Sequence, residues 1–150
     1  MKDVTKFFLP EKFQDQVEYI NGNYKRQDRF SRDWFNSKGF YQASANDNGY
    51  DLYDMRSYID GQLKDHGFKT VCEERASLIT CWPGQAYGQH VDEMYTVHVP
   101  VNTNKYSFLS IGHNLYHFEV GNFYIANTKK EHSAFNLGSE PRTHILFFAF

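Results

Sequence analysis

The sequence predicts a mainly β domain with helices confined to its first part, and two observations support this fold class. From Lys69 onward, short runs rich in Val, Ile, Phe, Tyr and Thr alternate with Gly, Asn and Pro, which is typical of closely spaced strands in a sandwich or barrel. Before that point, apolar residues recur at helical spacing. We therefore expect one domain over residues 1–150, with a helical and loop part at 1–68 packed on a β core at 69–150.

Two amphipathic helices are expected in the first part, over residues 10–25 and 50–66. Their apolar faces comprise Phe13, Val17 and Ile20 in the first helix, and Leu52, Met55, Ile59 and Leu63 in the second. Pro10 suits the start of the first helix, and Gly67 suits the C-cap of the second. Residues 28–49 have no clean period and end in Asn, Asp and Gly, so they predict a loop.

The β core is predicted from six apolar runs. They are "SLITCW" at 77–82, "MYTVHVPV" at 94–101, "YSFLSI" at 106–111, "LYHFEV" at 115–120, "NFYIAN" at 122–127 and "THILFFAF" at 143–150. Cys72 and Cys81 are an odd number of positions apart on one extended segment, so they should face opposite ways and form no disulfide. Unpaired cysteines fit a reducing, cytoplasmic setting.

Charge and hydropathy exclude two classes of partner. The net charge of −2 gives no electrostatic basis for binding nucleic acid or an anionic membrane surface. No apolar run approaches the roughly 20 residues that a membrane-spanning helix needs. We expect a small-molecule or peptide partner instead; the oligomeric state is left open by the sequence.

A histidine and an aspartate, His90 and Asp92, open the run that continues as "MYTVHVPV". In a strand, residues two apart point to the same face, so the imidazole and the carboxylate would be aimed at one point. Such a pair suits a metal ion, although it also suits a polar surface turn. The remaining chain has to distinguish these alternatives.

The C-terminal part contributes His132 and, ten residues later, Arg142. Arg142 begins a very apolar final strand and shares its face with His144, Leu146 and Phe148. It is either the polar end of an interior row or a surface cap that pairs with Glu140.

Together these residues indicate a particular kind of metal chemistry. Two histidines and one carboxylate form the facial triad of non-haem Fe(II) oxygenases, which leaves three coordination positions open. A bidentate 2-oxo acid can fill two of them and O₂ the third. A dicarboxylate co-substrate also needs a cation for its far end, and Arg142 offers a bidentate fork.

From about Ser77 to Phe150, the chain resembles the aspartyl/asparaginyl β-hydroxylase-like branch of the Fe(II)/2-oxoglutarate dioxygenases, which includes some proline hydroxylases. The matching stretches are "PG" at 83–84, "HVD" at 90–92, "HVPVNTN" at 98–104 and "HSAFNLGSEPRTHILF" at 132–147. The resemblance implies a double-stranded β-helix, the jelly-roll or cupin-like barrel. It also implies hydroxylation of an amino acid or a peptidyl side chain of the Pro, Asp or Asn class.

The resemblance implies roles for individual residues. His90, Asp92 and His132 would hold Fe(II), and Arg142 would bind the tail carboxylate of 2-oxoglutarate. His98 matches a family histidine near the co-substrate, but a hydrogen-bonded barrel histidine is an equal alternative, and His144 is interpreted as supporting core. Many family members carry an Arg two residues before the histidine of "HVPV"; this chain has Thr96 there, so one co-substrate contact is missing or comes from elsewhere.

Two other classes of function stay open at this point. A cupin-type metal protein that does not use 2-oxoglutarate is one, because "GNFYIANTKKEHSAFN" has the spacing of a second cupin motif. The first cupin motif requires His-x-His, however, and here it is His90-x-Asp92. The other is a non-catalytic β-sandwich binding module. The resemblance does not extend to the first seventy residues, and the substrate is expected to be recognised there and in the loops.

Overall fold

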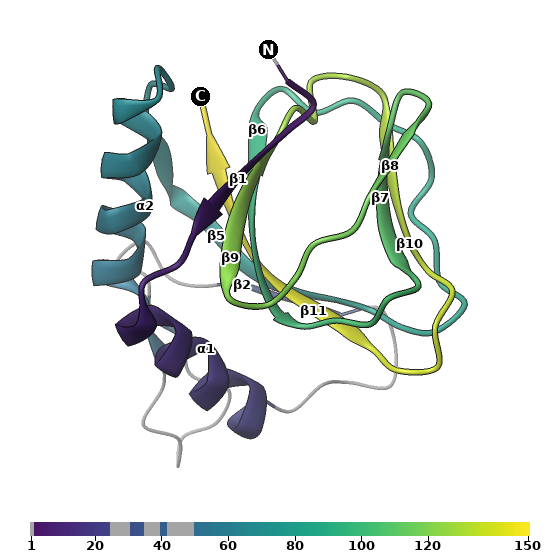
Figure 1. Cartoon of the computed structure of the whole chain (residues 1–150), viewed down its shortest axis with the longest axis horizontal. Helices are drawn as coiled ribbons and strands as arrows, with labels where there is room; N and C mark the ends of the chain where they lie inside the picture. Colours follow the sequence, from purple (N-terminus) through teal and green to yellow (C-terminus); the bar gives the residue numbers. More distant parts are fainter. Residues whose placement is uncertain (1, 25–30, 35–39, 42–49) are drawn as a thin grey trace.

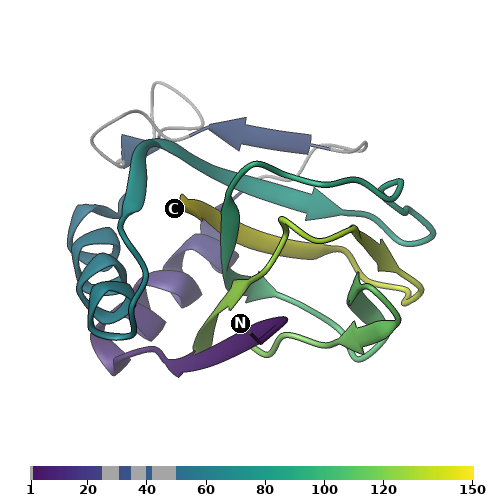
Figure 2. The same ribbon diagram turned by 90° about the horizontal axis from the view of Figure 1, so that it is seen from above.

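In a computed structural model, which describes residues 2–24, 31–34, 40–41 and 50–150, a six-stranded sheet faces a three-stranded sheet (Figure 1). Two helices cover the outer face of the larger sheet, and Figure 2 shows them at the end of the molecule away from the smaller sheet. The strand order is β1-β9-β6-β11-β5-β2 in the larger sheet and β10-β7-β8 in the smaller. This curled pair of antiparallel sheets confirms the predicted double-stranded β-helix.

The elements follow one another as β1 (Val4–Phe8), α1 (Glu11–Asn23), β2 (Ser31–Trp34), β3 (Phe40–Tyr41), β4 (Tyr50–Asp51), α2 (Tyr53–Asp65), β5 (Val71–Cys81), β6 (Tyr95–Asn102), β7 (Ser107–Ile111), β8 (Asn114–Tyr116), β9 (Asn122–Ala126), β10 (His132–Asn136) and β11 (Arg142–Ala149). β3 and β4 form a separate two-stranded pair. None of the helices in the described ranges is long and apolar enough to cross a membrane.

Both predicted helices are confirmed. α1 buries Phe13, Val17 and Ile20 against the sheet, the face that the sequence predicts. α2 ends at Asp65 and is closed by Gly67, whose φ of +88° suits glycine. The Gly67 and Phe68 N–H groups donate to the carbonyls of Lys64 and Leu63, which is the Schellman arrangement.

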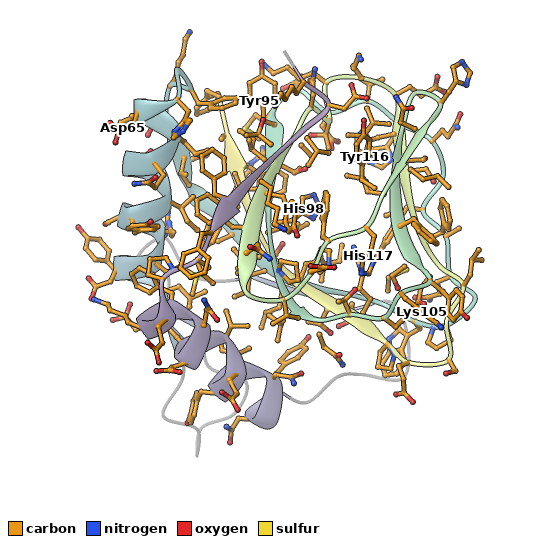
Figure 3. All side chains as sticks on the ribbon, in the orientation of Figure 1. Asp65, Tyr95, His98, Lys105, Tyr116 and His117 are labelled. Carbon is orange, nitrogen blue, oxygen red and sulfur yellow. The ribbon has the colours of Figure 1, made fainter. Side chains whose placement is uncertain are left out.

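Successive side chains of the two central strands, β6 and β11, point alternately to the hydrophobic core and to the interior of the barrel. On β11, Ile145, Phe147 and Ala149 face the helices and join the main hydrophobic core. On β6, Val97, Val99 and Val101 do the same. The residues between them therefore point into the space between the two sheets, where the side chain of His98 lies in Figure 3.

Some elements differ from the sequence-based expectation. Strand β1, which pairs with β9, and strand β10, which pairs with β7, do not appear among the predicted runs. Strand β2 lies inside the predicted loop at 28–49 and pairs with β5; most of that loop lies outside the described residues. Both cysteines are free, as predicted.

Candidate active site

Three side chains with metal-binding atoms converge where β6 and β10 begin. Asp92 Oδ2 lies 3.2 Å from His132 Nε2, and Asp92 Oδ1 lies 3.7 Å from His90 Nε2. One candidate ligand atom from each residue lies within 4.8 Å of the other two. Ligand atoms about 2.1 Å from an ion and at right angles lie about 3 Å apart, so the three groups are close to the spacing of one face of an octahedron.

The local structure differs from the strand that the His90-x-Asp92 spacing predicts. Regular strand β6 begins only at Tyr95, and His90 lies in the preceding segment. The backbones of His90 and His132 form an isolated antiparallel bridge, with both N–H groups donating across it at 3.0 Å. This pairing places the two imidazole rings 4.2 Å apart, centroid to centroid. The convergence therefore comes from a contact between distant segments.

Both histidines are oriented in the same way. His90 Nδ1 donates to the Gly88 carbonyl at 2.7 Å, and His132 Nδ1 donates to the Lys130 carbonyl at 2.9 Å. A proton on Nδ1 leaves a lone pair on Nε2, the atom of each ring that faces Asp92. The rings are thus held in the tautomer that a metal ion requires. His132 is buried, whereas His90 is exposed, so the cluster opens to solvent on the His90 side.

The cluster forms part of the wall of a cavity of about 290 Å³. Apolar side chains supply much of the remaining wall: Ile79, Leu109, Ala134, Leu146 and Phe148. The polar lining comprises Arg75, Tyr87, Thr96, His98, Thr128 and Arg142 in addition to the three cluster residues. One metal-competent cluster, apolar walls and a few polar groups are the usual composition of a small-molecule site.

Arg142 is the most unusual of these residues because it is a buried cation for which the described part of the chain provides no anionic partner. Its side chain is 5% exposed, and among the described residues no carboxylate lies within ion-pair distance. The Nε atom has no hydrogen-bond partner there. Burial lowers the pKa of the guanidinium. The alternative in which Arg142 caps the strand at the surface and pairs with Glu140 is therefore wrong.

Three further polar side chains connect Arg142 to β6. Arg142 Nη1 lies 3.2 Å from His144 Nδ1, and since a guanidinium can only donate, that nitrogen must accept. The hydrogen between His98 Nδ1 and His144 Nδ1, 3.1 Å apart, consequently belongs to His98. His98 Nε2 then accepts from the Thr96 hydroxyl at 2.9 Å. The Thr96 side chain thus supports His98, at the position where the family resemblance had led us to expect an Arg.

The pKa values of His98 and His144 lie well below the ordinary value for histidine. Burial is the main cause for both rings, and the adjacent positive charge of Arg142 lowers the pKa values further. Both rings are therefore neutral near pH 7. A neutral ring has one nitrogen that donates a hydrogen bond and one that accepts, as the hydrogen bonds of His98 and His144 require.

The structure brings together all five residues predicted from the sequence, since His90, Asp92, His98, His132 and Arg142 line one cavity. Sequence reasoning did not single out Arg75, Tyr87 or Thr128. Arg75 is exposed, and with Arg142 it supplies the strong cations of the described lining. A charged residue inside the long strand β5 was the signal that could have identified it.

Known proteins with solved structures share this fold over nearly the whole chain. The viral collagen prolyl hydroxylase of Paramecium bursaria Chlorella virus 1, solved in complex with 2-oxoglutarate, is 12% identical, with a TM-score of 0.65 over 99% of this chain and 96% of the other. A 2OG-Fe(II) oxygenase family oxidoreductase from Burkholderia pseudomallei is 10% identical, with a TM-score of 0.64 over 98% and 84%. A Trichoplax adhaerens prolyl hydroxylase, bound to a peptide fragment of the hypoxia inducible factor oxygen degradation domain, is 13% identical, with a TM-score of 0.66 over 99% and 83%.

The fold is thus that of the 2-oxoglutarate–Fe(II) oxygenases. The sequence model of the aspartyl/asparaginyl beta-hydroxylase family matches residues 62–150, and the chain belongs to that family. Membership confirms the resemblance found in the sequence and the prediction of an oxygenase of the hydroxylase type. A search of curated protein sequences finds no significant match.

Proposed function

We propose that this protein is an Fe(II)- and 2-oxoglutarate-dependent hydroxylase in which His90, Asp92 and His132 hold the iron and Arg142 binds the far carboxylate of 2-oxoglutarate. The observation that carries the proposal is the buried Arg142, which has no carboxylate partner among the described residues, in the cavity of the His-Asp-His cluster. An ion inside a protein needs a counter-ion, and a dicarboxylate that chelates a metal at one end supplies it at the other.

Each residue has a separate task in this proposal. The Nε2 atoms of His90 and His132 and the carboxylate of Asp92 would hold the iron through three protein ligands, a number that leaves room for co-substrate and O₂. When bound, the iron supplies oxidative decarboxylation of the 2-oxo acid to succinate and CO₂, coupled to hydroxylation of an unactivated C–H bond. The apolar walls would limit the access of water from the interior of the barrel.

His98 is proposed to support the co-substrate site through Arg142 as well as to line it. Its Nδ1–H and the Arg142 guanidinium both point at His144 Nδ1, so the two side chains are held by one acceptor. This arrangement fixes the guanidinium at one position along the cavity.

The hydroxylated group is proposed to be an amino acid or a peptidyl side chain of the Pro, Asp or Asn class. The family and the peptide-bound prolyl hydroxylase of the same fold support this class. Residues 1–150 are proposed to act as one domain, and the free cysteines fit a cytoplasmic setting.

The proposal is tested by titrating 2-oxoglutarate into the anaerobic Fe(II) protein and following the metal-to-ligand charge-transfer band. Arg142→Lys keeps the charge but loses the fork, so the affinity for 2-oxoglutarate should fall roughly 10- to 100-fold while iron affinity is unchanged. Lys105→Arg, the reverse exchange at an exposed residue outside the described cavity lining, is the control and should leave the midpoint in place.

An unshifted midpoint in Arg142→Lys would sink the co-substrate assignment even if iron bound normally. Succinate release from 2-oxoglutarate, measured with and without Fe(II), separates the hydroxylase from a cupin-type protein that does not use 2-oxoglutarate. This second assay requires no knowledge of the hydroxylated substrate.

A further inference from the structure

We propose that Asp3 is a positioning residue for the metal site, because it fixes the loop whose carbonyl groups orient Asp92 and His132. The loop comprises residues 127–131, between β9 and β10, and is called the ligand loop below. The inference rests on the proposed function for the identity of the metal ligands. It assigns a role to the N-terminal part of the chain, which lies outside the family match at residues 62–150.

The ligand loop contacts two of the three candidate ligands directly. The Thr128 carbonyl accepts a hydrogen bond from the backbone N–H of Asp92 at 2.9 Å. The Lys130 carbonyl accepts from His132 Nδ1 at 2.9 Å. The buried Thr128 hydroxyl also donates to the Met94 carbonyl at 2.8 Å, on the segment that leads from Asp92 into β6. Movement of this loop would therefore displace both the aspartate and the imidazole.

Asp3 holds both ends of the same loop. Its backbone carbonyl accepts from the Asn127 N–H at 2.8 Å, at the first residue of the loop. Its carboxylate accepts from Lys130 Nζ at 2.8 Å, on the residue whose carbonyl orients His132. The adjacent pairing of Val4 with Ala126 aligns the two segments. Main chain and side chain of one residue thus fix the loop at two points.

The Asp3 carboxylate is itself held from a third element. The Tyr116 hydroxyl donates to it at 2.7 Å and Asn114 Nδ2 at 3.3 Å, both from β8. The Asp3 side chain is only 12% exposed. These contacts hold the Asp3 carboxylate in a defined position. The Lys12–Asp54 pair is different, because its charged atoms lie 3.9 Å apart and its side chains are 70% and 76% exposed. Asp3 therefore offers an ordered partner to Lys130, whose own side chain is 55% exposed.

The test is a Co(II) titration of metal-free protein, followed by the absorption of the bound ion. Asp3→Asn removes the charge, and Lys130→Met removes the ammonium but retains the carbonyl that His132 uses. Loss of a group that orients a ligand typically costs 10- to 100-fold in metal affinity. Asp3 acts one bond further away, so we expect each variant to bind Co(II) about 3- to 10-fold more weakly.

A second readout needs no metal. In the metal-free protein, the Nδ1–H proton of His132 should exchange with solvent at least about 3-fold faster in both variants, because its acceptor is no longer fixed. Lys130→Arg retains a donor for Asp3 and should restore wild-type behaviour in both measurements. Lys12→Met removes an exposed lysine of comparable length and should change neither.

The outcomes separate this inference from the proposed function. Wild-type Co(II) affinity in both Asp3→Asn and Lys130→Met, next to weakened binding in His132→Ala, would overturn the positioning role alone. A lower free energy of unfolding with unchanged affinity would also overturn it, since Asp3 would then stabilise only β1. If His132→Ala binds Co(II) as tightly as wild type, the metal assignment itself is wrong.

Discussion

Arg142 carries a cost that the described structure does not offset. A buried charge loses several kcal/mol of hydration, and removing a partner from such a charge destabilises a protein because nothing compensates the loss. In Arg142 the compensation is limited to one neutral acceptor, His144 Nδ1, while Nε has none. We therefore expect the guanidinium to lower the stability of the ligand-free protein and, under the proposed function, to become favourable when a carboxylate enters the cavity.

Replacement of Arg142 by an apolar residue should consequently stabilise the ligand-free protein. We expect Arg142→Met to raise the free energy of unfolding by about 1 kcal/mol or more without 2-oxoglutarate. Saturating 2-oxoglutarate should raise the stability of the wild type and leave the variant unchanged. Urea unfolding with and without the ligand measures both effects. If the ligand-free Arg142→Met variant is less stable than the wild type, the charge is already compensated in the folded protein. The control Arg75→Met, at an exposed site, should change the free energy of unfolding little.

At the scale of elements, His98 on β6 and His144 on β11 connect the two central strands inside the barrel. Their pKa values lie well below that of an unfolded histidine, chiefly because of burial. Both rings bind protons more readily in the unfolded chain than in the folded one. The stability contributed by keeping them neutral is therefore fully present above about pH 6.5 and is lost as pH falls below that value.

We expect the free energy of unfolding of the metal-free protein to decline below about pH 6.5, with a slope of up to roughly 1.4 kcal/mol per pH unit for each ring. Chemical unfolding at a series of pH values, with a chelator present, measures the slope. The double variant His98→Gln, His144→Gln should flatten the curve between pH 5 and 6.5, whereas His113→Gln, at an exposed histidine, should leave it unchanged. An identical slope in the double variant would contradict the assignment.

Helices and strands whose apolar residues follow a clear pattern could be predicted from the sequence. Strands that exist because a neighbouring strand pairs with them could not. α1 and α2 repeat apolar residues at helical spacing, and β6 and β11 carry long apolar runs. Strands β1 (VTKFF) and β10 (HSAFN) lack the apolar runs that identified the equally short β7 and β9, and pairing with β9 and β7 defines them. The His90-x-Asp92 spacing similarly picked out two residues that the structure brings next to His132, but it predicted the wrong local structure, because the bridge to His132 comes from the fold.

The candidate site shows the same limit. Residue types and spacing were sufficient to select His90, Asp92, His132 and Arg142, since few patterns combine these groups. The burial of Arg142, away from every carboxylate that the structure describes, depends on how strand β11 lies within the sheet. The support from Asp3 joins segments more than 120 residues apart in sequence, as the Lys130 contact shows, and has no local signal.

For the molecule as a whole, the larger sheet has one face whose side chains form the hydrophobic core and another whose side chains line the candidate site. One face packs on α1 and α2 and holds the main hydrophobic core, and the other lines the cavity. Substitutions on the two faces of this sheet should thus affect different properties. Leu63 of α2 belongs to the core, and Leu146 of β11 belongs to the cavity wall, so the pair offers one chemical change in two settings.

We expect Leu63→Ala to lower the free energy of unfolding by about 2–5 kcal/mol, because it leaves a void in a closely packed core. The 2-oxoglutarate affinity of the folded variant should stay within about 2-fold of wild type, since that face never contacts the ligand. Leu146→Ala removes apolar surface from the cavity wall, so it should weaken 2-oxoglutarate binding about 3- to 10-fold. It should cost less stability than Leu63→Ala, because the side chain already borders open space.

Urea unfolding of the two variants measures their stability, and anaerobic titration measures their affinity for 2-oxoglutarate. If Leu63→Ala loses as much affinity as Leu146→Ala, the two faces of the sheet are coupled.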